Sequence, residues 1–124
     1  MAYIYGKKYT KIELLKRVGD ISQIAKIKRY KLTEGNESQV EAIDINTGTG
    51  FSFTILPGRG MDISYAEYCG KPLCWRSSTG DVNPSFFNSH KYEWLRNFFG
   101  GLLTTCGLTY AGHPCVDENE ELGL

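Results

Sequence analysis

Residues 39–46 read QVEAIDIN and residues 51–56 read FSFTIL, and the loop Thr47-Gly48-Thr49-Gly50 lies between them. Both segments alternate in part between apolar and polar side chains, which is the period of a β-strand with one buried face. A short loop with two glycines can adopt the positive φ values that a hairpin needs. The pattern therefore predicts an antiparallel hairpin, in which the isoleucines of the first strand share a face with Phe51, Phe53 and Ile55.

A β-rich pattern continues along most of the chain. Further strands are expected at residues 24–32, 61–68, 71–75 and 100–108, with a helical turn at 92–99 and a long polar loop at 77–91. Many short strands joined by Gly-containing turns are typical of an antiparallel β-sandwich and not of a parallel α/β sheet. The sequence shows no linker and no internal repeat, so one mostly β domain over residues 1–124 is expected.

A short helix is expected near the N-terminus. Thr10 and Glu13 have the spacing of a capping box, in which each side chain accepts a hydrogen bond from the backbone N–H of the other residue. Gly19 is a typical helix stop. These signals predict a helix over residues 10–18, followed by a turn that Asp20 can cap.

The charge balance excludes several classes of protein. Lys and Arg together number 14, as do Asp and Glu, so the formal net charge is zero. Non-specific nucleic-acid binding and electrostatic membrane binding both need an excess of basic residues. No apolar run approaches the roughly 20 residues that span a bilayer, and residues 1–11 lack the apolar core of a signal peptide. A cytoplasmic location is therefore expected.

The cysteines predict neither a metal site nor a disulfide framework. They lie at positions 69, 74, 106 and 115, and no pair has the two-residue spacing that is typical of a zinc site. In the cytoplasm these thiols are expected to be free. Cys106 is expected to be a buried structural thiol, and His113 with Cys106 and Cys115 lacks an obvious fourth ligand. No metal and no cofactor are therefore expected.

Arg59 is the sharpest candidate for ligand binding. It lies between Gly58 and Gly60, directly after a predicted strand, and glycines let a backbone approach a ligand closely. A guanidinium can donate to two sugar hydroxyls at once, and Asp62 can accept from another. The equally weighted alternative is an Arg59–Asp62 clamp that only stabilises the turn.

Trp75 and Arg76 end another predicted strand. The indole face of Trp75 can stack on the C–H face of a pyranose, and Arg76 can contact a ring oxygen. Packing of Trp75 into the core is the favoured reading of this residue. The glycines in Gly100-Gly101 are expected to allow close packing of neighbouring sheet elements, since the run lacks the Lys-Ser/Thr ending of a phosphate loop.

Several of these motifs occur together, in order, in one known family. The chain resembles the uncharacterised aldose 1-epimerase-like proteins of the galactose mutarotase-like superfamily. The resemblance lies in Gly19-Asp20-Ile21-Ser22-Gln23, Leu56-Pro57-Gly58-Arg59-Gly60-Met61-Asp62-Ile63, Gly70-Lys71-Pro72-Leu73-Cys74-Trp75-Arg76-Ser77 and Gly100-Gly101-Leu102-Leu103-Thr104-Thr105-Cys106-Gly107-Leu108. It implies a large antiparallel β-sandwich and an aldose ligand, with Arg59, Asp62, Trp75 and Arg76 as substrate-binding residues.

The same resemblance implies a binding protein without its own catalysis. Interconversion of anomers needs a base for the anomeric hydroxyl and an acid for the ring oxygen. Members that catalyse it use a His acid and a Glu base on later segments, and no residue here matches either one. The chain is therefore expected to be the N-terminal portion of a carbohydrate-binding, mutarotase-like protein.

Three alternatives remain open from the sequence. One is a standalone sugar-sensing module, and a second is a structural β-module that assembles through strand edges. The third is an enzyme with an unrelated reaction that uses Cys106 or His113. Unpaired strand edges associate readily and a zero net charge offers little repulsion, so a homo-oligomer is expected.

Overall fold

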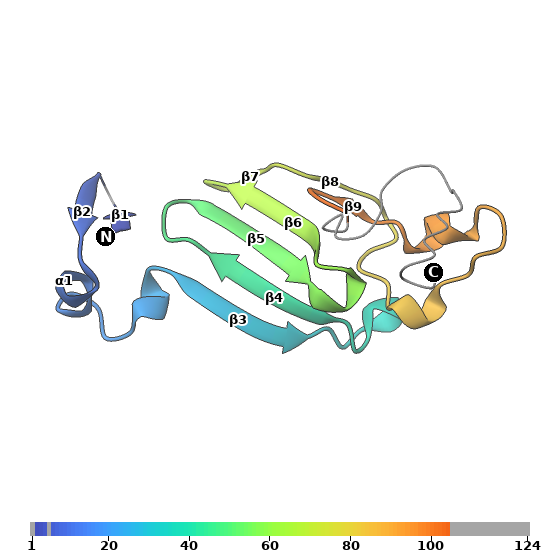
Figure 1. The fold of residues 1–124 in the computed structure, drawn as a ribbon, viewed down its shortest axis with the longest axis horizontal. Coiled ribbons are helices and arrows are strands. Elements are labelled where there is room, and N and C mark those ends of the chain that lie inside the picture. The colour runs from blue at the N-terminus through green and yellow to red at the C-terminus, as the bar shows by residue number, and fades with distance from the viewer. Residues whose placement is uncertain (1, 5, 105–124) are drawn as a thin grey trace, which may run out of the picture.

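The computed structural model describes residues 2–4 and 6–104. Its centre is a five-stranded antiparallel sheet with strand order β3-β4-β5-β6-β7, and β1–β2 and β8–β9 form two two-stranded sheets (Figure 1). The strands are β1 (Ala2–Ile4), β2 (Lys7–Tyr9), β3 (Lys26–Lys31), β4 (Glu41–Asn46), β5 (Phe51–Leu56), β6 (Asp62–Tyr68), β7 (Lys71–Pro72), β8 (Trp75–Arg76) and β9 (Gly100–Gly101). This mostly β, antiparallel structure is consistent with a β-sandwich.

Within the described residues, helical structure consists of one α-helix and short 3₁₀ turns. They are α1 (Lys11–Leu15), η1 (Ile21–Gln23), η2 (Gly35–Glu37), η3 (Pro57–Arg59), η4 (Pro84–Phe86) and η5 (Glu93–Asn97). The strands β1 and β2 and the helix α1 lie beyond one end of the central sheet, whereas η4 and η5 lie at the other end (Figure 1). Within residues 2–4 and 6–104, no helix combines the length and the apolar character that crossing a bilayer requires.

The predicted hairpin is confirmed. Strands β4 and β5 pair antiparallel with Ile45 opposite Phe53 and Ile43 opposite Ile55, so the apolar residues share one face of the sheet. The rings of Phe51 and Phe53 stack along that face with centroids 5.2 Å apart. The period-two pattern was sufficient here because the pairing register places Ile43, Ile45, Phe53 and Ile55 on the same side of the sheet.

The N-terminal capping box is confirmed, but the helix is shorter than expected. The Thr10 hydroxyl accepts from the Glu13 N–H at 3.3 Å, and the Glu13 carboxylate accepts from the Thr10 N–H at 2.7 Å. The helix ends at Leu15 because the Arg17 N–H bonds to the Leu14 carbonyl, three residues back, and tightens the last turn. Asp20 caps the following turn as expected.

Two of the expected strands differ in the structure. Residues 71–75 form two short strands, β7 and β8, because only β7 pairs with β6 and β8 pairs with β9 instead. Within residues 100–104, the expected strand pairs at Gly100–Gly101 and through an isolated bridge from Leu103 to Ile63. Leu103 is 44% exposed, so this part of the segment is not buried, and residues 105–108 lie outside the described residues.

The buried core lies on the sheet face opposite the Phe51–Phe53 stack. It comprises Val40, Ala42, Leu56 and Phe99, with Tyr30 and Leu32 packed against it. Phe99 comes from the segment after η5 and is 1% exposed. A residue far along the chain therefore closes the core over one end of the sheet, and its surroundings form the candidate site.

A β-bulge at Ser64 in β6 connects the sheet to the chain after β8. Thr54 lies opposite Tyr65, but the next residue, Ile55, lies opposite Ile63, so Ser64 is an extra residue on β6. Ser64 is fully buried, and its hydroxyl donates to Asp81 at 2.6 Å. Bulges commonly redirect a side chain in this way.

The phenol of Tyr30 is expected to make the protein less stable at alkaline pH. Burial and the hydrogen bond to Asp44 at 2.9 Å raise the pKa of Tyr30 to about 12. In the unfolded chain the pKa of a tyrosine is about 10. The neutral phenol therefore stabilises the fold below about pH 10, and that contribution is lost as the pH rises toward about 12. We expect the free energy of unfolding to fall across this window in chemical denaturation.

The variant Tyr30→Phe isolates the effect. It is expected to reduce the fall in stability between about pH 10 and 12, because the folded chain then no longer holds the extra proton of Tyr30. The exposed Tyr92 is the matched control, since Tyr92→Phe is expected to retain the fall. An unchanged slope in Tyr30→Phe would assign the alkaline transition to other groups.

Candidate functional site

Arg59 ties three separate segments together. It ends η3, and the following Gly60 and Met61 both have a φ of 65°, a left-handed turn that leads into β6. The Arg59 guanidinium donates from Nε to Asp62 at 3.4 Å, from one terminal nitrogen to the Val82 carbonyl at 2.8 Å, and from the other to the Asn97 carbonyl at 2.8 Å. Arg59 thus forms the expected clamp with Asp62 and extends it to both ends of residues 82–97.

The Arg59 clamp is buried. The side chain of Asp62 is 2% exposed and that of Arg59 is 15% exposed. The guanidinium carbon also lies 4.8 Å from the centre of the Phe99 ring, a cation–π distance. Arg59 therefore connects the turn before β6, the residue 82–97 loop and the core.

A pocket of about 230 Å³ opens beside this clamp. Its lining consists of Gly58, Arg59, Asp62, Pro84, Phe87, Asn97 and Thr104. The pocket lies between the turn before β6 and the residue 82–97 loop. Of the four residues expected to bind substrate, Arg59 and Asp62 are in this lining.

Asn97 is the residue that sequence reasoning missed. It is 5% exposed and lines the pocket, yet neither its side-chain oxygen nor its side-chain nitrogen has a hydrogen-bond partner within residues 2–4 and 6–104. Buried polar atoms are nearly always paired, because an unpaired one costs free energy. Asn97 has no motif around it, so its orientation toward the pocket could not be read from the sequence.

A family profile matches residues 37–124 with the description "Domain of unknown function (DUF4432)". The chain belongs to the DUF4432 family. The matched region contains β4 to β9, the Arg59 clamp and the pocket, whereas α1 and β1 to β3 precede it. No curated protein and no solved structure matches the chain significantly.

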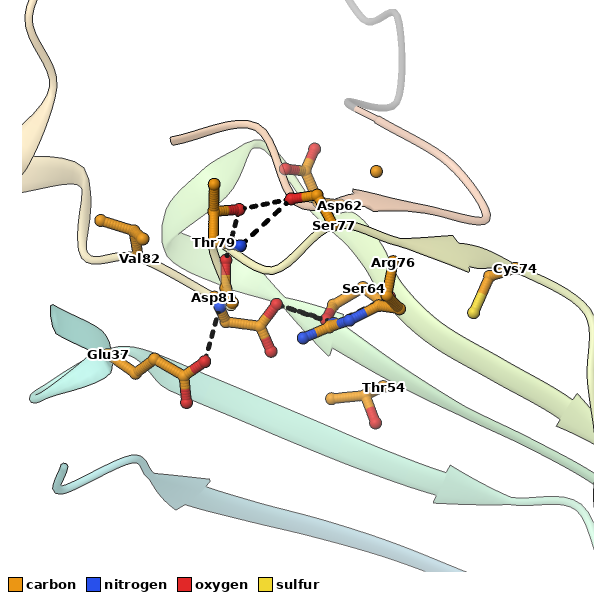
Figure 2. Close-up of polar contacts among 12 residues, drawn as sticks. Glu37, Thr54, Asp62, Ser64, Cys74, Arg76, Ser77, Thr79, Asp81 and Val82 are labelled. Atoms are coloured by element: carbon orange, nitrogen blue, oxygen red, sulfur yellow. Dashed lines mark hydrogen bonds and ion pairs between the residues drawn. The ribbon is translucent and has the colours of Figure 1, made fainter. Parts of the chain in front are cut away.

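Arg76 belongs to a second polar cluster of this DUF4432 domain. Figure 2 shows the cluster, in which Arg76 donates to the Asp81 carboxylate at 2.8 Å and to the Ser64 carbonyl at 3.0 Å, and contacts the Ser64 hydroxyl. The backbone N–H of Asp81 in turn donates to the Glu37 carboxylate at 2.8 Å. These bonds fasten the chain after β8 onto the sheet.

The two arginines are neighbours through Phe99. The guanidinium carbon of Arg76 lies 5.5 Å from the centre of the Phe99 ring, which Arg59 also contacts. Arg76 itself is not in the pocket lining. Its bonds to Ser64 and Asp81 fix the guanidinium beside the ring that Arg59 also contacts.

Trp75 is a surface residue and does not fill the core. It is 64% exposed and lies over Gly100, where an added Cβ would come within 2.5 Å of the indole. The favoured reading of Trp75 as a core residue is therefore wrong, because the absent side chain of Gly100 lets the indole lie flat on β9. Trp75 does not line the pocket that contains Arg59 and Asp62.

The remaining chemical candidates that the structure describes are two cysteines. Cys69 and Cys74 are free thiols. The described part of the chain holds no group of three or more His, Cys, Asp or Glu side chains arranged for a metal ion. The predictions for Cys106, His113 and Cys115 concern positions outside the described residues.

Proposed function

We propose that this DUF4432 domain is a carbohydrate-binding, mutarotase-like domain that binds an aldose in the pocket of Arg59, Asp62 and Asn97. The observation that carries the proposal is the buried side-chain amide of Asn97, which lines the pocket without a hydrogen-bond partner in the described residues. A buried amide costs free energy when it is unpaired and gains it back when a ligand pairs with it. The sequence resemblance to the aldose 1-epimerase-like proteins supports the same ligand class.

The chemistry of the pocket suits a hydroxylated ring. An amide offers one acceptor oxygen and two donor hydrogens, and a sugar hydroxyl can donate to the first and accept from the second. Pro84 and Phe87 add apolar surface to the same lining. A pyranose has the matching pair of surfaces, with hydroxyls at its edge and C–H groups on its face.

We propose binding without catalysis by this chain alone. Anomer interconversion needs an acid and a base that work near neutral pH. The described pocket lining contains one carboxylate, Asp62, and no histidine, and Asp62 is held by Arg59. A cytoplasmic location, where the thiols of Cys69 and Cys74 stay reduced, is part of the same proposal.

The variant Asn97→Leu tests the proposal. Leucine has a similar size but no polar atom, so the unliganded variant is expected to be as stable as the parent protein, or more stable by about 1 kcal/mol. Glucose or galactose at millimolar concentration is expected to raise the melting temperature of the parent protein by mass action. The variant is expected to lose that rise.

The matched control is Asn36→Leu. The side chain of Asn36 is exposed on η2 and is not part of the pocket lining, so this variant is expected to keep the sugar-dependent rise. The proposal fails if neither sugar shifts the melting temperature of the parent protein. It also fails if Asn97→Leu shows the full shift.

A structural module that assembles through strand edges is the second candidate. The observation in its favour is β3, an edge strand of the central sheet with Ile27 76% exposed. Four of its six residues are basic (Lys26, Lys28, Arg29 and Lys31), however, and lysines on an edge oppose pairing. A homo-oligomer in analytical ultracentrifugation, together with no sugar-dependent melting shift, would favour this candidate.

A further inference from the structure

One side chain of the pocket lining, the ring of Phe87, is also exposed to solvent. Phe87 lines the pocket, yet it is 59% exposed. Only part of its ring therefore faces the pocket, and the rest is open to solvent. Phe87 is placed to contact both a group inside the pocket and a group that lies just outside it.

Exposed aromatic residues are concentrated on the loop that carries Phe87. We call residues 84–94 the aromatic loop, and its exposed rings are Phe86 (57%), Phe87 (59%), Tyr92 (78%) and Trp94 (43%). A single exposed apolar residue is ordinary, but several on one loop indicate an interaction surface. The loop lies at one end of the central sheet (Figure 1).

The partner that fits this surface is uncharged and polar. Residues 82–89, which include the pocket residues Pro84 and Phe87, read VNPSFFNS. This part has no ionisable side chain, and hydroxyl and amide groups flank its two rings, whereas His90, Lys91 and Glu93 follow farther along the aromatic loop. A phosphorylated or acidic partner would need a cation whose charge is not already paired, whereas Arg59, in the described pocket lining, is already paired with the carboxylate of Asp62. Aromatic rings together with Ser and Asn are also typical of the loops with which antibodies bind their ligands.

The pocket is too small for more than one ring. Its volume is about 230 Å³, below the roughly 300–1,000 Å³ of common small-molecule pockets. We propose that the pocket holds the terminal residue of a neutral glycan, and that the next sugar residue stacks on Phe87 outside it. This inference rests on the proposed sugar binding, and it adds that the natural ligand is a chain and not a free aldose.

A series of sugars of increasing length tests the inference. Glucose, maltose, maltotriose, cellobiose, galactose and lactose would be titrated into the protein by ligand-observed NMR. At least one disaccharide is expected to bind about fivefold more tightly than its monosaccharide, the gain expected from one additional ring contact. Because Phe87 also lines the pocket, Phe87→Ala is expected to weaken monosaccharide binding, but it is expected to bring the ratio of disaccharide to monosaccharide affinity down to about one.

Two further variants control for the ring itself. Phe87→Tyr keeps an aromatic face and is expected to keep the gain. Tyr3→Ala removes a ring of similar exposure, 60%, at the opposite end of the sheet and is expected to change nothing. Because Phe87 is more than half exposed, its replacement is not expected to unfold the protein.

The outcomes separate this inference from the proposed function. Equal affinity for monosaccharides and disaccharides would overturn the extended site and leave sugar binding in the pocket intact. An undiminished gain in Phe87→Ala would overturn it as well. If no sugar in the series binds, the proposed function fails and the inference fails with it, and self-association abolished by Phe87→Ala would then assign the loop to a second copy of the chain.

Discussion

Replacing Arg59 by alanine is expected to lower the free energy of unfolding by about 3 kcal/mol or more. The variant takes the guanidinium away from the carboxylate of Asp62, which is 2% exposed. It also removes the donors to the Val82 and Asn97 carbonyls and the contact with the Phe99 ring. Breaking a buried ion pair costs more than losing an ordinary hydrogen bond, because the attraction between the two charges disappears while the carboxylate stays buried. Urea denaturation measures it.

Arg29→Ala is the matched control. Arg29 also pairs with a carboxylate, that of Glu41, but the two side chains are 66% and 35% exposed. Exposed ion pairs contribute about 0–1 kcal/mol, because water solvates either partner when the other is removed. If Arg59→Ala and Arg29→Ala destabilise the protein equally, the Arg59 clamp does not close the fold as we infer.

Replacing Gly101 by alanine is expected to destabilise the protein by about 3 kcal/mol. Gly101 has a φ of 89°, a conformation that a residue with a Cβ rarely adopts. An added Cβ would also lie 2.5 Å from the Ile63 carbonyl oxygen and 3.2 Å from that of Ser64. Because both atoms belong to the backbone of β6, neither can move without breaking the pairing beside the bulge. Thermal and urea denaturation of the variant measure the effect.

Two other glycines separate backbone strain from steric overlap. Gly70 has a φ of 75° but open space around it, so Gly70→Ala is expected to cost only about 1 kcal/mol of strain. Gly19 has neither positive φ nor a neighbour within 4 Å, so Gly19→Ala is expected to change stability by less than about 1 kcal/mol. A Gly101→Ala variant no less stable than Gly70→Ala would contradict the close approach of β9 to β6.

About half of the candidate site could be predicted from the sequence. Arg59 and Asp62 were identified because the glycines around them, directly after a strand, constrain the local backbone. Asn97 was missed because it is 38 residues from Arg59, and only the bond from Arg59 to its carbonyl brings the two together. No local pattern records such a contact.

Trp75 was singled out from the sequence, but its burial was predicted wrongly from its residue type. A tryptophan at the end of a strand is usually buried on average, but here the strand pairs with β9, which contains only Gly100 and Gly101. The indole covers a glycine, and its other face remains exposed. The exposure of Trp75 thus depends on its partner strand and not on its own sequence.

Local signals by themselves determined the β4–β5 hairpin, the capping box of α1 and the mostly β character of the chain. Each depends on residues a few positions apart, whose steric and hydrogen-bonding preferences act within one element. The tertiary structure alone decided the pairing of β8 with β9, the burial of Phe99 under two arginines and the position of Asn97 in the pocket. These features join segments far apart in the chain, and their free energy comes from contacts that exist only when the whole sheet has closed.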